Sequence, residues 1–240
     1  QKGTAEEQFV NLQLPMRQIA KLSQKYKIVI THGNGPQVGF ILRRCELACS
    51  ELHPVPLDSI GADTQGSIGY MIQQSLANEF SRHGLTKQAV TVVTQVRVDA
   101  EDPAFQTPTK PIGSFMDEET AKKHAEEDGW DIKEDAGRGW RRVVASPLPK
   151  EIVERASIQK LVDSGFVVVA VGGGGIPVVR NGKGDLEGIA AVIDKDYATA
   201  LLAARLNADR FIVSTAVDQV YVDFGKPTQR GVSQLTVSEA

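Results

Sequence analysis

The stretch FVVVAVGGGG at residues 166–175 constrains the fold more than any other part of the sequence. Its first six residues are apolar and show no polar alternation, which is typical of a strand buried on both faces of a parallel sheet. Four glycines follow. Each of them loses conformational entropy on folding, so a run of four calls for a reason, such as close approach of the backbone to a ligand. We therefore expect a buried strand that ends in a loop, with a ligand lying close to the glycine backbone.

A similar strand and loop occur near the start of the chain. Residues 27–31 are rich in β-branched side chains, and Gly33, Asn34 and Gly35 follow before apolar residues return at helical spacing. A glycine-rich turn before a helix exposes N–H groups and favours an anion, although a merely tight turn remains the alternative. Because the carboxyl ends of parallel strands share one edge of a sheet, the two loops can face a common ligand.

Helical and strand-like segments alternate through most of the chain. Helices are expected at residues 5–26 with a kink at Pro15, and at 38–49, 68–80, 152–161 and 197–206; strands are expected at 27–31, 89–98, 166–171 and 210–217. This alternation predicts an α/β fold with a parallel sheet covered by helices on both faces. Residues 99–149 break the rhythm, and we expect a small protruding subdomain there, with a polar helix at 118–127 and a strand at 140–145.

Composition excludes several classes of protein. The chain is 41% hydrophobic and carries a formal net charge of −3, and it has neither a basic stripe for nucleic acid nor the roughly 18-residue apolar run that a membrane helix needs. Cys45 and Cys49 lie four apart on a predicted helix without a second Cys or His pair at metal spacing. Core side chains are therefore favoured over half of a metal site, and a reducing, cytoplasmic setting is expected.

Capping-box patterns stand at both ends of the chain. Thr4 precedes Glu7, and Thr236 precedes Glu239, each with the spacing of a helix start. The sequence has no initiator Met, and it stops one residue after the second box. We therefore expect an internal segment of a longer protein.

The spacing of Gly33, Gly35 and Gly39 resembles a dinucleotide fingerprint, but the other parts of that motif are missing. A dehydrogenase needs a second strand that ends in an acidic residue about 20 residues later, and the region in question contains two prolines in eight residues. A P-loop would need Gly-Lys-Ser/Thr, which is also missing. With these two motifs excluded, the remaining functional interpretation is a glycine-rich turn whose backbone N–H groups bind an anion.

Two lysines stand out by their context. Lys195 follows Asp194, the expected N-cap, and a cation at a helix start is unfavourable unless an anion is nearby; Asp196 could orient it. Lys110 lies between two prolines that stiffen its loop. Exposed, solvated lysines remain the alternative at both positions.

His32 could act as a base, but the sequence offers no Ser or Cys nucleophile with a supporting acid, so a structural role is favoured. Glycine-rich anion cradles combined with lysines suggest phosphoryl transfer, which depends on positioning and charge neutralisation more than on a covalent catalyst. From the residues alone, the prediction is phosphate chemistry on a small substrate.

Several motifs together resemble those of the carbamate kinases, a branch of the amino acid kinase family. They are THGNGPQVG (31–39), QGSIGYMIQQSL (65–76), PTKPIG (108–113), EDAGRGWRRVVASPLP (134–149), GGGGIPV (172–178), AVIDKDYATALLA (191–203) and DFGKPTQ (223–229). The resemblance implies a three-layer αβα sandwich with a mainly parallel open sheet and a protruding subdomain. It also implies a cytoplasmic homodimer connected with arginine metabolism.

The implied reaction is reversible phosphoryl transfer between carbamoyl phosphate and ADP, giving ATP and carbamate, with Mg²⁺ accompanying the nucleotide. Lys195 would bridge the phosphates as a catalytic and nucleotide-binding residue, Asp196 would orient the lysines, and Lys110 would reach over the substrate from the subdomain. The residues implied to bind carbamate or the moving phosphoryl group are Gly33, Asn34, Gly35, Gly173 and Gly174. Those implied to surround the nucleotide are Ala216, Val217, Tyr221, Gly225 and Lys226.

The same resemblance predicts two lobes, with the substrate lobe at residues 1–190 and the start of a nucleotide lobe at 191–240. It also predicts a first strand ending in Gly-Gly-Asn-Ala and a late lysine motif, neither of which is in this sequence. The enzymatic alternative is another amino acid kinase, such as an acetylglutamate or uridylate kinase. An inactive, carbamate-kinase-like binding or regulatory protein is the alternative outside the enzymes.

Overall fold

The computed structural model describes residues 3–135, 137–215, 217–236 and 238. Contacts divide the chain into two units, Gln1–Ala208 and Asp209–Ala240, and each unit is described by itself. The predicted boundary between lobes at residue 190 stays a prediction. Within the described ranges, no helix is long and apolar enough to cross a membrane.

The parallel sheet predicted from the sequence lies at the centre of the first unit. Its strands are β1 (Val29–Ile30), β8 (Val167–Val169) and β2 (Ala89–Thr91), in the order β1-β8-β2. Both neighbours run parallel to β8, with Val168 opposite Val29 on one side and Val90 on the other. The valine-rich strand is therefore the middle strand, as its uninterrupted apolar sequence predicts.

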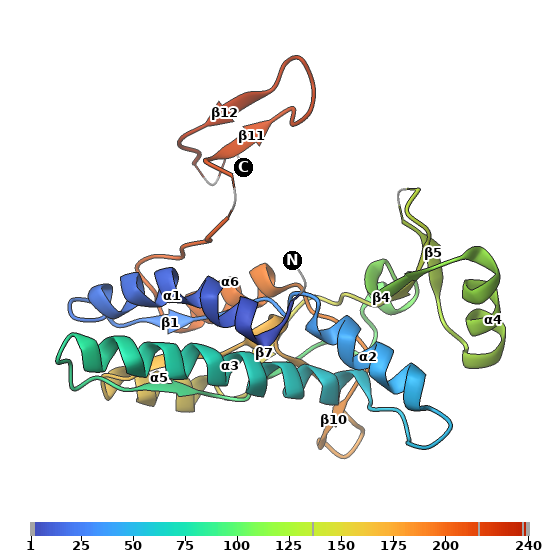
Figure 1. The fold of residues 1–240 in the computed structure, drawn as a ribbon, viewed down its shortest axis with the longest axis horizontal. Coiled ribbons are helices and arrows are strands. Elements are labelled where there is room, and N and C mark those ends of the chain that lie inside the picture. Colours follow the sequence, from blue (N-terminus) through green and yellow to red (C-terminus); the bar gives the residue numbers. More distant parts are fainter. Residues whose placement is uncertain (1–2, 136, 216, 237, 239–240) are drawn as a thin grey trace. The chain divides into compact units, whose positions relative to one another are not determined.

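Helices cover both faces of this sheet. Val167 and Val169 of β8 pack in one cluster with α1 (Ala5–Leu22) and α3 (Leu57–Arg82), which lie alongside each other in Figure 1. Val168 packs in another cluster with α5 (Arg155–Asp163) and α6 (Lys195–Arg205). Because successive side chains of a strand point to opposite faces, this alternation confirms the three-layer αβα arrangement.

A second sheet continues from the first. Its strands are β10 (Leu186–Gly188), β9 (Ile176–Arg180), β3 (Gln95–Arg97) and β7 (Glu151–Ile152), in that order. The strand expected at residues 89–98 is in fact two strands, β2 and β3, which belong to different sheets. The strand pairing is interrupted at Thr94. Its hydroxyl donates a hydrogen bond to the Val92 carbonyl at 2.7 Å, and this bond turns the backbone from one sheet to the other.

Two predicted helix boundaries are also corrected. Ile152 belongs to strand β7 and pairs with Val96, so α5 begins three residues later than expected, at Arg155. Helix α3 begins at Leu57 and not near residue 68, because Leu57 and Ile60 extend its buried face. Helix α1 begins as predicted, with the Thr4 side chain accepting a hydrogen bond from the Glu7 N–H.

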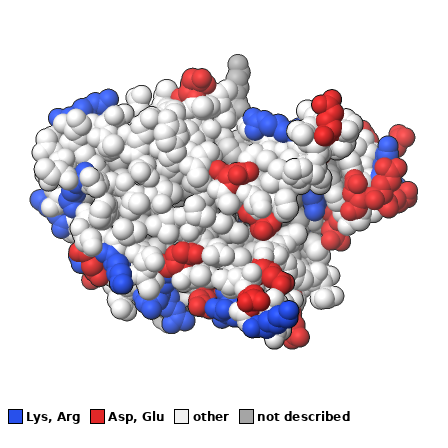
Figure 2. Space-filling view, turned by 90° about the horizontal axis from the view of Figure 1, so that it is seen from below, with Lys and Arg blue, Asp and Glu red and all other residues white. Residues whose placement is uncertain are grey.

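The protruding subdomain is an antiparallel sheet with one helix. Its strands, in the order β4-β6-β5, are β4 (Lys110–Met116), β6 (Trp140–Val144) and β5 (Ile132–Glu134), and its helix is α4 (Glu118–Asp128); the short turn η1 (Pro103–Phe105) precedes them. Figure 1 shows these elements gathered at one end of the first unit. Acidic side chains gather at the same end in Figure 2, where the polar helix α4 lies.

The second unit contains a hairpin of β11 (Val220–Val222) and β12 (Arg230–Val232). The strand predicted at residues 210–217 is not formed in its described part, residues 210–215 and 217. The segment is apolar enough, but Phe211, Ile212 and Val213 are exposed and no described strand pairs with them. The cap predicted at Thr236 and Glu239 falls partly outside the described residues.

Candidate active site

The first glycine loop joins β1 to α2 (Gln37–Ala48). Gly35 adopts a left-handed conformation with φ 54°, and the Gln37 N–H donates to the Asn34 carbonyl at 3.2 Å to close the turn. The residue before the helix, Pro36, provides no side-chain cap for the first N–H groups of α2. The Gln37 N–H is used in this turn and the Phe40 N–H donates to the Pro36 carbonyl at 3.0 Å, so among the described residues the N–H groups of Val38 and Gly39 remain available to an anion at the loop.

The second glycine loop follows β8 and forms the short turn η2 (Gly172–Gly174). Four of its backbone positions have positive φ: Val171 (53°), Gly173 (65°), Gly174 (95°) and Gly175 (89°). The Gly173 N–H donates to the His32 carbonyl at 2.7 Å, which joins this loop directly to the first. Asn34 packs against Gly173, and its Oδ1 is buried without a hydrogen-bond partner among the residues that the structure describes.

The two predicted lysines lie beside these loops, each with its own carboxylate. Lys110 Nζ lies 3.3 Å from Asp194 Oδ2, although the two residues are 84 positions apart in sequence. Lys195 Nζ lies 3.2 Å from both carboxylate oxygens of Asp196, and its stem packs over Gly33. The resemblance implies that Asp196 orients both lysines; in the structure Asp196 pairs with Lys195, and Lys110 pairs with Asp194.

Asp194 uses its two oxygens for different purposes. Oδ1 accepts the Asp196 N–H at 2.9 Å and caps α6 as predicted, while Oδ2 pairs with Lys110. Partial burial would raise the pKa of this carboxyl, but the backbone hydrogen bond and the lysine outweigh burial and hold the pKa below its ordinary value. Asp194 is therefore ionised at neutral pH.

These groups surround a cavity of about 560 Å³. Among the predicted site residues it is lined by Gly33, Asn34, Gly35, Lys110, Gly173 and Lys195. Gly174 lies behind the lining, against the carbonyl of Ile193. A compact cavity of this size, with the two predicted lysines and two glycine loops, can hold a small anionic substrate.

Sequence reasoning missed two charged residues in the lining. Asp194 was predicted only as a helix cap, because the residues around it in the sequence do not indicate that it pairs with Lys110, 84 positions away. Arg141 of β6 also lines the cavity; its guanidinium donates to the Gly113 carbonyl at 3.1 Å and lies 5.1 Å from the ring centre of Phe115. Arg141 belongs to the motif at residues 134–149 that carries the family resemblance. Its position in the cavity could not be predicted from that motif, because it depends on how the subdomain folds.

His32 lies beneath the two loops. Burial lowers the pKa of its imidazole, against the opposing effect of its hydrogen bond with the Gly33 carbonyl, so the ring is neutral at neutral pH. Nδ1 lies 3.0 Å from that carbonyl and is therefore the protonated nitrogen, while Nε2 is buried next to Gly172 and has no hydrogen-bond partner in the described part of the chain. This placement fits the structural role that the sequence analysis favoured.

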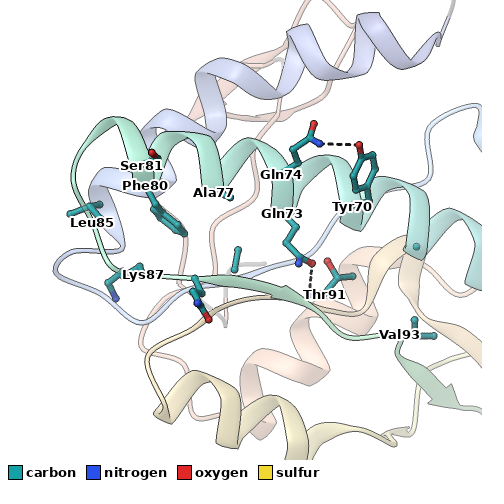
Figure 3. Close-up of a pocket in the computed structure, with 13 residues that line it drawn as sticks. Tyr70, Gln73, Gln74, Ala77, Phe80, Ser81, Leu85, Lys87, Thr91 and Val93 are labelled. Atoms are coloured by element: carbon teal, nitrogen blue, oxygen red, sulfur yellow. Dashed lines mark hydrogen bonds between the residues drawn. The ribbon is translucent and has the colours of Figure 1, made fainter.

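A larger hollow of about 930 Å³ lies between α3 and β2, outside the glycine loops. Figure 3 shows its wall of α3 side chains, with the Gln73 side chain reaching the backbone of Thr91. Lys87 is the one charged residue among those that line it. Without converging charge, this hollow is a weaker candidate for catalysis than the glycine-loop cavity.

The residues implied to bind the nucleotide belong to the second unit. Tyr221 lies on β11, and Gly225 and Lys226 lie in the turn of the hairpin, where Lys226 pairs with Asp223 at 3.2 Å. Val217 is exposed before the hairpin, and Ala216 lies outside the described residues. Their nucleotide-binding role stays a prediction.

A known protein family, known proteins and solved structures match this chain over most or all of its length. A profile of the amino acid kinase family matches residues 3–240. The carbamate kinase of Thermococcus kodakarensis is 51% identical over 244 residues, covering 100% of this chain and 77% of that protein. The carbamate kinase-like protein YahI of Escherichia coli is 53% identical over 220 residues, covering 90% of this chain and 69% of that protein.

A solved structure is similar in fold as well as in sequence. The carbamate kinase from Giardia lamblia bound to AMP-PNP matches with a TM-score of 0.89 and 43% identity, covering 97% of this chain and 74% of that chain.

Proposed function

The chain belongs to the amino acid kinase family, and from that premise we propose that it transfers a phosphoryl group reversibly between carbamoyl phosphate and ADP, giving ATP and carbamate. Relatives about half identical to it are carbamate kinases. The observation in this chain that carries the proposal is the cavity in which Lys110 and Lys195 meet both glycine loops. Phosphoryl transfer needs this combination, because the reaction depends on alignment and on neutralising the charge of the phosphoryl oxygens.

The first glycine loop would hold the carbamoyl end of the substrate. Gly33 and Gly35 let a compact anion approach the backbone, and α2 supplies uncapped N–H groups. The buried, unpartnered Oδ1 of Asn34 is an acceptor that the amino group of carbamate could satisfy and that a bare phosphate could not. Gly173, in contact with Asn34, would complete this wall together with Gly174 behind it.

The lysines would neutralise the moving phosphoryl group. Lys195, at the first position of α6, would bridge the transferred phosphate and the nucleotide, with Asp196 holding its ammonium. Lys110, on β4 of the subdomain, would reach over the carbamoyl phosphate and exchange Asp194 for the substrate anion. Ala216, Val217, Tyr221, Gly225 and Lys226 would contact ADP, within a nucleotide lobe that starts near residue 191.

Mg²⁺ would accompany the nucleotide. Asp194 and Asp196 are each engaged by a lysine, and no group of three or more His, Cys, Asp or Glu side chains is placed to hold a metal in the described parts of the chain. Mg²⁺ commonly binds through substrate phosphates with only one or two carboxylates, so a site without a cluster of three protein ligands can still use it. Bound in that way, it would neutralise nucleotide phosphate oxygens.

The direct test is ATP formation from carbamoyl phosphate and ADP by the full-length protein. The same preparation would be offered ATP with carbamate, N-acetylglutamate and UMP in parallel. We expect turnover with the carbamate pair only. Turnover with another acceptor would support a different amino acid kinase, and nucleotide binding without any turnover would support the inactive binding protein.

We further propose that the protein is a cytoplasmic homodimer that acts in arginine metabolism. The exposed Val10 and Leu14, one turn apart on α1, offer an apolar surface that a second copy could cover. Sedimentation velocity over a concentration series tests the dimer, and a monomer at all concentrations would contradict it.

A further inference from the structure

A fully buried glutamine links α3 to the second glycine loop. Gln65 is 1% exposed, and its Nε2 donates to two carbonyls, that of Gly172 at 3.0 Å and that of Thr94 at 3.1 Å. Its Oε1 accepts the Thr94 N–H at 2.7 Å. An apolar side chain would suit this buried position on α3 equally well for packing alone, so the three hydrogen bonds call for an explanation.

Thr94, which is also fully buried, extends this link to both ends of the loop. Its Oγ1 accepts the Val171 N–H at 3.0 Å, immediately before the glycines. Its carbonyl accepts the Ile176 N–H at 2.9 Å, immediately after them. Gln65 and Thr94 together therefore fix positions 171, 172 and 176 around the four glycines.

The backbone that they fix is one that a free chain would rarely adopt. Val171 has a φ of 53°, a left-handed conformation that costs a β-branched residue more than most. Gly173, Gly174 and Gly175 also have positive φ, and a glycine run samples many other conformations equally well. Something outside the loop must select this one.

We propose that Gln65 and Thr94 are positioning residues for the phosphoryl-transfer site, holding the loop from Val171 to Ile176 in the one conformation that brings Gly173 to the cavity wall. They do not line the cavity themselves. The kinetic part of this inference rests on the proposed function, whereas the structural part can be measured without it. A loop fixed in advance costs no ordering when substrate binds.

Helix α3 offers a matched control. Gln73 lies two turns further along the helix, and its Oε1 also accepts a backbone N–H, that of Thr91 on β2, at 3.0 Å. Figure 3 shows this bond at the hollow beside α3, whose lining includes no residue of either glycine loop. Gln65→Leu and Gln73→Leu thus remove the same kind of side chain from the same helix, but only the first touches the loop.

Hydrogen exchange measured by mass spectrometry on the full-length protein tests the structural part. Gln65→Leu should speed exchange at least about tenfold in a peptide covering residues 171–176, since the bond to the Gly172 carbonyl is lost together with the two bonds that hold Thr94. Gln73→Leu should speed exchange around residues 89–93 and leave 171–176 unchanged. Unchanged exchange at 171–176 in Gln65→Leu, or equal acceleration there in both variants, would overturn the proposal.

A second pair of variants covers the case in which Gln65→Leu does not fold. Thr94→Val removes the acceptor for the Val171 N–H with little change in shape, whereas Thr94→Ser keeps it. We expect Thr94→Val to accelerate exchange at 171–176 and to lower kcat with carbamoyl phosphate about tenfold, with the KM for ADP within twofold. Thr94→Ser should restore both, and a Ser variant as impaired as Val would overturn the assignment.

The two parts of the inference fail separately. If the wild-type protein forms no ATP from carbamoyl phosphate and ADP, the proposed function is wrong, and the exchange measurements still decide whether Gln65 and Thr94 hold the loop. If the wild type is active and Thr94→Val matches it in kcat and KM, the loop does not need this support for catalysis, and the positioning role is wrong.

Discussion

The two glycine-rich loops of the cavity differ in what surrounds their backbone. A Cβ atom added at Gly35 would meet the end of the Gln37 side chain at 3.0 Å, and that flexible side chain can move away. A Cβ added at Gly174 would lie well inside 3.0 Å of the Ile193 carbonyl oxygen, which is fixed backbone. There is therefore room beside Gly35 in the first loop, whereas the space beside Gly174 in the second loop is filled by the protein itself.

This difference corrects the reason that the sequence analysis gave for the run of four glycines. A ligand close to the backbone was expected to explain them, but an added Cβ at each of the four positions would collide with protein atoms. The neighbours, from Gly172 to Gly175, are His32, Asn34, Ile193 and Val96. Consecutive glycines can therefore mark dense packing around a catalytic loop as well as contact with substrate.

The largest effect should come from Gly174→Ala. The new methyl group meets the Ile193 carbonyl at a backbone with φ 95°, so we expect a loss of roughly 2–5 kcal/mol in the free energy of unfolding, measured in urea. Gly184→Ala is the matched control, because Gly184 has φ 90° but open space around it. Equal losses in the two variants would mean that conformation, and not packing, explains the glycine.

Lys195→Ala tests the cavity wall formed by the first loop, because the aliphatic part of the lysine side chain packs over Gly33. Loss of an ammonium that stabilises the transferring phosphoryl group should lower kcat by about 10² or more, with the fold retained. Turnover and thermal unfolding would be measured on the same samples. Lys183→Ala, in the exposed turn between β9 and β10, is the control, and near-normal turnover of the Lys195 variant would reject its catalytic role.

Gly35→Val tests whether the open side of the first loop receives the substrate. The branched side chain would occupy the space of a bound carbamoyl group, so we expect the KM for carbamoyl phosphate to rise about tenfold or more, while the calorimetric affinity for ADP changes little. Gly84→Val, at a similar positive φ away from the cavity, controls for backbone strain. Equal weakening of ADP would place the nucleotide on this loop and reverse the assignment of the site.

The smallest effect concerns His32, which lies between the two loops. Because burial lowers its pKa in the folded state, the unfolded chain binds the proton more readily, and stability falls as pH drops below about 6.5. Between pH 7.5 and 5.5 the wild type should lose up to about 1.4 kcal/mol more than His32→Asn in urea unfolding. Parallel pH curves for the two proteins, with the exposed His53→Asn as reference, would contradict this.

Features encoded by neighbouring residues could be predicted from the sequence. The central strand β8 and the N-cap at Asp194 follow from apolar runs and capping chemistry that local sequence displays. The division of residues 89–98 at Thr94 could not be predicted, because the local bond to Val92 is joined by bonds from Gln65, 29 positions away, and from the second glycine loop. The pairing of Lys110 with Asp194 is hidden for the same reason, and residues 210–215 have strand-like sequence but no described partner strand.

The order of strands in the central sheet sets the timing of folding. Strands β1 and β2 both pair with β8, so neither has a partner among the described strands until residues 167–169 have been synthesised. At translation rates of about 5–20 residues per second, β1 waits roughly 7 to 28 seconds, and such long-range parallel pairing is slow in itself. Helices α1 and α3 pack together without needing any residue beyond Arg82, so we expect the nascent chain to assemble its sheet on this helix pair.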